Sequence, residues 1–140
     1  MKLNSENLKI ALQRKGRLEE HSKLMLKSIG LDFEYYEGRF FSHCQNFPLD
    51  ILFLRDDDIP EYVQDGVTDL GIVGLNVVQE KESKVVQLDS LGFGTCKLSI
   101  AVPQRSSLSN LQDLNGKRIA TSHTRILQKF LEGQVHFLQD

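Results

Sequence analysis

A cluster of charged residues follows an apolar run in the middle of the chain. The run Ile51–Leu54 is followed at once by Arg55 and by three aspartates, Asp56 to Asp58. A second apolar run, Leu70–Val73, ends at Gly74. Strand, short helix and strand predict a βαβ unit with parallel strands, so Arg55 and Gly74 should both lie at carboxyl ends, where open α/β sheets bind ligands.

The helix of this unit has its own signals. Asp58 and Glu61 have the spacing of a capping box, Pro60 falls in the first turn, and Gly66 falls where the helix would end. The aspartates can therefore be read as helix caps alone. The pattern leaves open a βαβ unit with polar loops and no ligand.

A second strand–loop–helix pattern stands near the amino terminus. Leu8–Leu12 predicts the first strand, and a helix with apolar residues at helical spacing should end at Gly30. The loop between them, Gln13–Arg17, holds three cations and a glycine. Such a loop could bind phosphates through backbone N–H groups and Lys15. It could equally be a solvated basic turn, because it has no Walker-type or dinucleotide glycine pattern.

The remaining segments predict further elements of an α/β protein. Asp32–Cys44 is typical of a hairpin whose second arm opens at Arg39. Helices are expected at Asn76–Glu82, within Ser106–Leu114 and around Ile126–Leu131, and strands at Val85–Leu91, Lys97–Val102 and Arg118–Thr121. We expect a first α/β lobe, residues 1–91, and the beginning of a second, residues 92–140. The second lobe has too few elements to be complete.

Composition excludes some classes of function. The 140 residues are 40% hydrophobic and 26% charged, as in ordinary globular proteins, and the net charge of -2 gives no bulk attraction to nucleic acid or membrane. Cys44 and Cys96 lack metal-ligand spacing and are interpreted as thiols in a reducing compartment. Met1–Leu12 has no apolar core for a signal peptide, and no segment is suited to span a bilayer. A cytoplasmic protein is expected.

The exact residue sequence of several blocks is more specific than their hydrophobic pattern. Together, in this order, they resemble the ATP phosphoribosyltransferase family over about residues 8–131, which is nearly the whole chain. The blocks are Ile10–Leu18, Asn46–Leu52, Leu54–Gly74, Leu91–Cys96 and Asn115–Ser122.

The resemblance implies a two-lobed α/β fold like that of periplasmic solute-binding proteins, with the active site in the cleft. The family joins ATP to phosphoribosyl pyrophosphate, giving N1-(5-phospho-β-D-ribosyl)-ATP and pyrophosphate, in the first step of histidine biosynthesis. The reaction uses Mg²⁺, to which we assign no protein ligand. Family members are oligomeric, so a homo-oligomer is expected of the full-length protein.

The resemblance also implies residue roles. Arg55 and Arg39 match arginines that act in catalysis. The residues expected to bind substrate are Gln13, Lys15, Gly16, Arg17, Asp69, Gly71, Gly74 and Asn76. The sequence departs from the family at Leu75, where many members carry Glu, and at His123–Thr124, where Tyr-Pro is common.

A further departure concerns the carboxyl end. The family's main phosphoribosyl-pyrophosphate loop lies beyond the point at which this sequence ends, so we expect a truncated transferase. If Asp140 is the true terminus, the chain alone should be almost inactive. The alternative function is then an inactive fragment that binds nucleotide or a full-length subunit. A solute-binding module, suggested by the fold alone, is poorly supported without an export signal.

Overall fold

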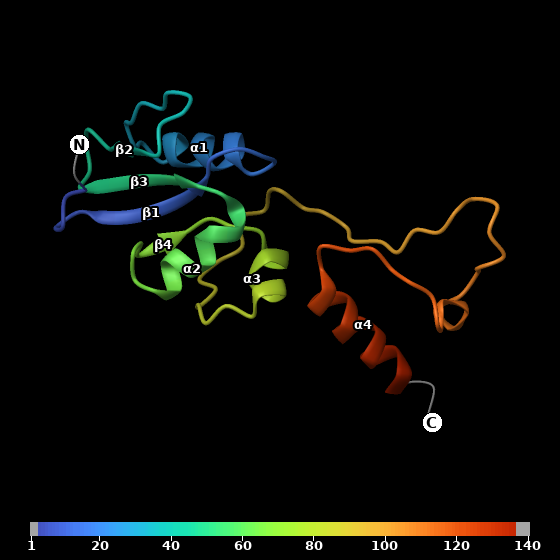
Figure 1. The fold of residues 1–140 in the computed structure, drawn as a ribbon. Coiled ribbons are helices and arrows are strands. Elements are labelled where there is room, and N and C mark those ends of the chain that lie inside the picture. The colour runs from blue at the N-terminus through green and yellow to red at the C-terminus, as the bar shows by residue number, and fades with distance from the viewer. Residues whose placement is uncertain (1–2, 137–140) are drawn as a thin grey trace. The chain divides into compact units, whose positions relative to one another are not determined.

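The computed structural model describes residues 3–136 and divides the chain into two compact units (Figure 1). Unit 1 is Met1–Gly94 and unit 2 is Thr95–Asp140. Regular structure is concentrated in unit 1, which contains the whole sheet. Among the described residues, no helix is both long and apolar enough to cross a membrane.

A mixed four-stranded sheet organises unit 1. The strands lie in the order β2-β3-β1-β4, and β1 pairs in parallel with both β3 and β4. β2 lies at the edge and runs antiparallel to β3. The strands are β1 (Leu8–Gln13), β2 (Phe41–His43), β3 (Leu49–Leu54) and β4 (Leu70–Gly71). The prediction that the strands before and after Arg55–Gly66 are parallel is confirmed, with β1 between them.

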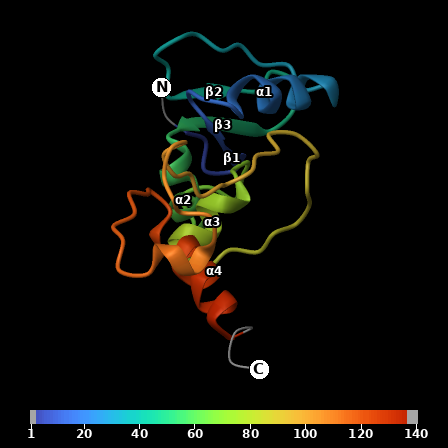
Figure 2. The same cartoon turned by 90° about the vertical axis from the view of Figure 1, so that its right-hand side faces the viewer.

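Helices lie on both faces of this sheet. α1 (Glu19–Ser28) covers one face, and α2 (Ile59–Gln64) and α3 (Leu75–Lys81) lie on the other, as Figures 1 and 2 show. Both faces of the central strands are therefore buried, which explains why β1 and β3 read as continuous apolar runs rather than as alternating ones. The core consists of Ile10, Leu12, Leu26, Phe33, Leu49, Ile51, Phe53 and Ile72.

Several predicted boundaries are confirmed. The first strand, the first helix and the strand before Arg55 lie where the apolar patterns placed them. Pro60 stands in the first turn of α2, and Gly66 follows its end with a φ of +72°. Positive φ is the conformation that glycine adopts most easily, so the sequence signal had a direct physical cause.

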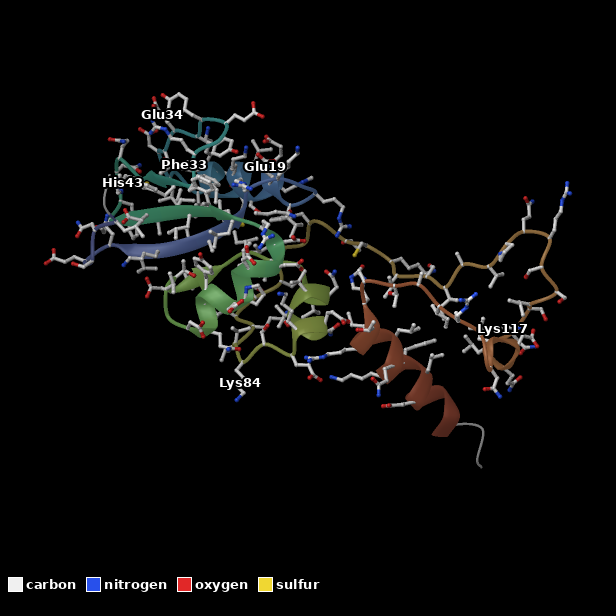
Figure 3. All side chains as sticks on the ribbon, viewed as in Figure 1. Glu19, Phe33, Glu34, His43, Lys84 and Lys117 are labelled. Carbon is white, nitrogen blue, oxygen red and sulfur yellow. The ribbon has the colours of Figure 1, made fainter. Side chains whose placement is uncertain are left out.

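The predicted hairpin at Asp32–Cys44 is wrong. Its second arm is β2, but β2 pairs with β3 and not with the segment before it. That segment is held by its side chains instead. Phe33 belongs to the core and is only 2% exposed (Figure 3). The centroids of the Tyr35 and Phe53 rings lie 4.6 Å apart. Burial of these rings stabilises the segment against the core, without hydrogen-bond pairing to β2.

The three strands predicted after residue 84 are also wrong. Residues 85–91, 97–102 and 118–121 have no regular structure. Leu98, in the alternating segment, is 57% exposed. An alternating pattern forms a strand only when a neighbouring strand accepts its hydrogen bonds, and within residues 95–136 no such ladder is present. Unit 2 has a short 3₁₀ helix, η2 (Leu111–Leu114), and one α-helix, α4 (Thr124–His136).

A buried carboxylate ties the amino-terminal segment to the sheet. The side chain of Asp50, in β3, is fully buried. Its Oδ1 accepts hydrogen bonds from His43 Nδ1 at 2.6 Å and from Asn7 Nδ2 at 3.0 Å, and its Oδ2 accepts one from the backbone N–H of Asn4 at 2.9 Å. Burial raises the pKa of Asp50, but these hydrogen bonds outweigh burial and hold the pKa below its ordinary value.

This arrangement predicts acid sensitivity. Because the folded pKa of Asp50 lies below the unfolded value of about 3.9, its contribution to stability is present above about pH 4 and is lost as pH falls through the folded pKa. Asp50→Asn should lower the free energy of unfolding at pH 7 by about 1–3 kcal/mol, because three donors lose a charged acceptor. Urea unfolding measured between pH 3 and 7 should also show a flatter acid limb for the variant.

The matched control is Asp65→Asn, which makes the same chemical change at an exposed position. Its unfolding free energy and pH profile should follow those of the wild type. An unchanged stability of Asp50→Asn would show that the carboxylate does not hold the amino-terminal segment.

Candidate functional site

The carboxyl edge of the parallel strands brings together groups from three parts of unit 1. β1 and β3 end in register, with Gln13 opposite Leu54. The ladder extends one step further, since Arg14 N–H donates to Leu54 O at 2.7 Å. Arg14 and Arg55 therefore leave the sheet from neighbouring positions.

Arg55 lies directly after β3 and is exposed. Its side chain is 72% exposed and makes a bidentate pair with Asp58, with Nε–Oδ2 at 2.9 Å and Nη2–Oδ1 at 3.2 Å. The hydrogen bonds and charge of Asp58 raise the pKa of Arg55, so the guanidinium stays charged. The predicted capping box is wrong, because the Asp58 side chain makes no cap hydrogen bond to α2 and binds Arg55 instead.

Arg39 reaches the same edge from the other side of β3. Since β2 is antiparallel to β3, with Phe41 opposite Leu52, the residues just before β2 lie beside the carboxyl end of β3. Phe53 N–H donates to Phe40 O at 2.7 Å and fixes this placement. The Arg39 guanidinium lies 4.9 Å from the centroid of the Tyr36 ring.

A shallow hollow accompanies Arg39. It has a volume of about 360 Å³ and is lined by Gly38, Arg39, Phe40 and Phe41. Nearby, the Tyr36 hydroxyl donates to the Glu34 carboxylate, which raises the pKa of Tyr36. The edge segment therefore combines exposed aromatic rings with a cation.

The loop after β1 is closed by its own first residue. Gln13 is 7% exposed, and its Oε1 accepts the Leu18 N–H at 2.9 Å. Gly16 has a φ of +131°, and a Cβ there would lie 2.5 Å from Gln13 Nε2. Gln13 therefore braces the loop from inside, while Lys15 and Arg17 are exposed on it.

Gly74 and Asn76 also lie at the carboxyl edge. Gly74 caps α3, and a Cβ there would lie 2.4 Å from Asn76 Oδ1. Because the Asn76 amide approaches the backbone this closely, a side chain at position 74 would force the amide to shift, which explains the glycine by local structure alone.

The structure places Asp69 apart from that edge, and it gives Gly71, the last residue of β4, a packing role. Asp69 precedes β4, and its Oδ2 accepts the Lys9 N–H at 2.8 Å, so its carboxylate is used to join β4 to the first half of β1. A Cβ on Gly71 would lie 2.6 Å from Ile59 Cγ2, so this glycine lets α2 approach the sheet closely.

Arg14 lies at this edge, although the sequence pattern did not predict it as a site residue. It was part of the basic loop, but its type and position did not distinguish it from its neighbours. Only the strand register, which sets it beside Arg55, and the ring of Phe40 near its guanidinium separate it from the other cations.

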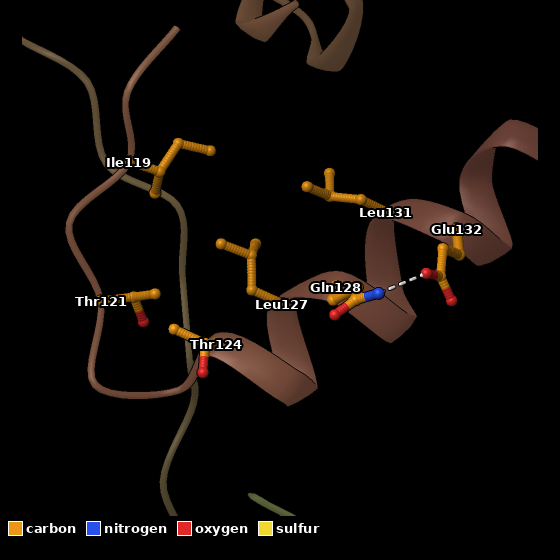
Figure 4. Close-up of a pocket in the computed structure, with 7 residues that line it drawn as sticks. All are labelled: Ile119, Thr121, Thr124, Leu127, Gln128, Leu131 and Glu132. Atoms are coloured by element: carbon orange, nitrogen blue, oxygen red, sulfur yellow. Dashed lines mark hydrogen bonds between the residues drawn. The ribbon is translucent and has the colours of Figure 1, made fainter.

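The described residues offer no preformed metal centre, and unit 2 contains a hollow. Within residues 3–136, no three His, Cys, Asp or Glu side chains are grouped so that they could hold a metal ion. The hollow in unit 2 has a volume of about 510 Å³ (Figure 4). Its walls are largely apolar, and none of the predicted site residues lines it; it is lined by Ile119, Thr121, Thr124, Leu127, Gln128, Leu131 and Glu132.

Comparison with known proteins gives consistent matches. The family model described as "HisG: ATP phosphoribosyltransferase" matches residues 55–137. The chain is 48% identical over 124 residues to the ATP phosphoribosyltransferase of Cytophaga hutchinsonii. That alignment covers 89% of this chain and 43% of the relative, so the chain spans less than half of the relative's length.

A solved structure also matches. It is a chain of the ATP phosphoribosyl transferase (HisG:HisZ) complex from Thermotoga maritima, with 35% sequence identity and a TM-score of 0.49. The match covers 57% of this chain and 38% of that chain.

The bracing role of Gln13 predicts a local effect of its loss. In Gln13→Leu the Leu18 N–H has no acceptor in a buried position, which costs about 1–3 kcal/mol. Hydrogen exchange of the Leu18 amide should accelerate by about tenfold or more. The exposed Gln45→Leu, the same change without that bond, should leave this amide protected. Unaltered exchange in Gln13→Leu would mean that the loop is held by other contacts.

Proposed function

Because the chain belongs to the ATP phosphoribosyltransferase family, we propose that it acts in the condensation of ATP with phosphoribosyl pyrophosphate, the first step of histidine biosynthesis. The observation that carries the proposal is the convergence of Arg55, Arg39 and the Gln13–Arg17 loop at one edge of the sheet. Ligands of α/β sheets bind at such carboxyl edges.

The proposed reaction is a displacement at the anomeric carbon. Adenine N1 forms the bond to C1 of the phosphoribosyl group as the bond from C1 to the pyrophosphate oxygen breaks. Positive charge develops on the ribose and negative charge on the departing pyrophosphate. We assign Arg55 and Arg39 to stabilise that pyrophosphate, because fixed cations are most effective where charge develops in the transition state.

The pair between Arg55 and Asp58 supports this role. The guanidinium already presents two parallel N–H donors to a carboxylate, which is the geometry that phosphate oxygens also accept. Both side chains are accessible, and exposed ion pairs contribute little stability. A bound phosphate could therefore replace Asp58 with little penalty.

The remaining assignments follow the family. Gln13, Lys15, Gly16 and Arg17 form the loop on the nucleotide side. Gly74 and Asn76 lie at the same edge, and we propose that they contact the nucleotide. Given their contacts, Asp69 and Gly71 would support the site from within the sheet.

We also propose the family's larger organisation. Residues 1–91 would form the first lobe and residues 92–140 the beginning of the second, in a two-lobed fold like that of periplasmic binding proteins. The division of the chain at Gly94 lies close to this boundary. The full-length enzyme would be a cytoplasmic homo-oligomer.

Mg²⁺ would enter with the substrates. Among residues 3–136 no group of three metal-ligating side chains is present. Phosphate oxygens of ATP and phosphoribosyl pyrophosphate are suitable Mg²⁺ ligands. We therefore assign the ion no protein ligand.

A second candidate function is nucleotide binding without condensation. It is favoured by the location of all the assigned cations in unit 1. Incubation of the 140-residue chain with ATP, phosphoribosyl pyrophosphate and Mg²⁺, followed by mass spectrometry, separates the two. Formation of phosphoribosyl-ATP supports the transferase. Calorimetric ATP binding without product supports the second candidate. The absence of both product and ATP binding would overturn both candidates for this chain.

Arg55→Ala should lower turnover by about tenfold or more in a protein that carries the complete family domain, because the leaving pyrophosphate loses a bidentate cation. The thermal unfolding midpoint should stay near that of the wild type, since Arg55 is exposed. Arg105→Ala, which removes an exposed arginine of unit 2, is the control and should retain the rate. A near-normal rate for Arg55→Ala would remove this residue from the mechanism.

A further inference from the structure

We propose that Arg14 is a third phosphate-binding cation of the candidate site and that the ring of Phe40 positions it. The inference rests on the proposed function and adds a ligand-binding residue and a positioning residue to it. Arg14 Cζ lies 5.1 Å from the centroid of the Phe40 ring, within the range of a cation–π contact.

The backbone fixes both partners at the carboxyl edge. Arg14 N–H is bonded to Leu54 O, one residue before Arg55. Phe40 O accepts the N–H of Phe53, on the opposite side of β3 from β1. The Arg14 side chain thus extends across the end of β3 to reach Phe40, and Arg55 emerges from that same strand end.

The exposure of Phe40 needs an explanation. Phe40 is 62% exposed although neighbouring aromatic residues, such as Phe33 and Phe53, are buried in the core. An exposed phenylalanine does not gain the full free energy of burial. Its contact with Arg14 gives the ring a specific partner at the site.

The cation of Arg14 is held differently from Lys23 and Arg55. Lys23 also lies over an aromatic ring, that of Tyr35, but it is neutralised by Glu19 and Glu20. Arg55 is paired with Asp58. Within residues 3–136, Arg14 forms no ion pair with a carboxylate, so an anion need not displace one to bind it.

The contact with the ring also leaves hydrogen-bonding groups available. It places the guanidinium near the ring without pairing its N–H donors with a carboxylate, so those donors can serve an anion. Arg39 is held over Tyr36 in the same manner. Two arginines held by rings, at the edge that also carries Arg55, suit a ligand with several phosphate oxygens, which is the class that contains inorganic pyrophosphate and the diphosphate of phosphoribosyl pyrophosphate.

Titration calorimetry of the 140-residue chain with inorganic pyrophosphate tests the proposal. Arg14→Gln should weaken binding by about tenfold or more, as expected for loss of a charged hydrogen-bond donor. Arg14→Lys should retain part of the affinity because it keeps the charge. Phe40→Leu should weaken binding roughly two- to fivefold, since the cation loses its ring. Phe47→Leu, an exposed ring elsewhere, should bind as the wild type does.

The double variant distinguishes positioning from a general structural effect. If Phe40 acts through Arg14, then Arg14→Gln should have a smaller effect in the Phe40→Leu background than in the wild type. Independent, multiplying effects would overturn the positioning role of Phe40. Circular dichroism and thermal unfolding of each variant verify that the fold is retained.

Arg55→Ala, measured in parallel, separates this inference from the proposed function. Loss of pyrophosphate binding in Arg55→Ala with wild-type binding in Arg14→Gln would overturn the role of Arg14 and leave the proposed site intact. No binding by the wild-type chain would overturn the pyrophosphate site as a whole.

Discussion

The parallel ladder between β1 and β3 is the constraint on which the candidate site depends. Both strands are buried on both faces, so a shift of their register would move apolar side chains out of the core. With Gln13 opposite Leu54, the basic loop and Arg55 must begin at the same edge. The geometry of the cations is thus a consequence of core packing, and the cations themselves contribute little to the stability of the fold.

The edge strand completes this arrangement. β2 is short, but its antiparallel pairing returns the chain so that Arg39 and Phe40 lie beside the end of β3. The buried Asp50 pairs with His43 of β2 at the other end of the same strands. One end of the sheet therefore carries a satisfied buried charge with a structural role, and the other carries exposed charges.

Much of unit 1 could be predicted because its strands are continuous apolar runs bounded by charged residues, glycine or proline. That signal is local. The hairpin at Asp32–Cys44 could not be predicted correctly, because the choice of β3 as the partner of β2 depends on residues that are distant in sequence. The expected strands of residues 85–121 fail for a related reason: alternation describes a surface that needs a partner, and the sequence does not say whether one is available.

The sequence by itself determined the family, the βαβ unit and the presence of Arg55 and Gly74 after strands, because block wording and apolar runs are properties of short segments. Only the tertiary structure decided what each polar group contacts. Asp69 binds the backbone of Lys9, away from the edge. Asp58 binds Arg55 instead of capping a helix, and the Arg14 guanidinium contacts the Phe40 ring. The physical reason is that these hydrogen bonds and ring contacts join strand ends, and the proximity of strand ends is set by register and strand order. Register and strand order depend on several segments together and cannot be predicted from any one of them.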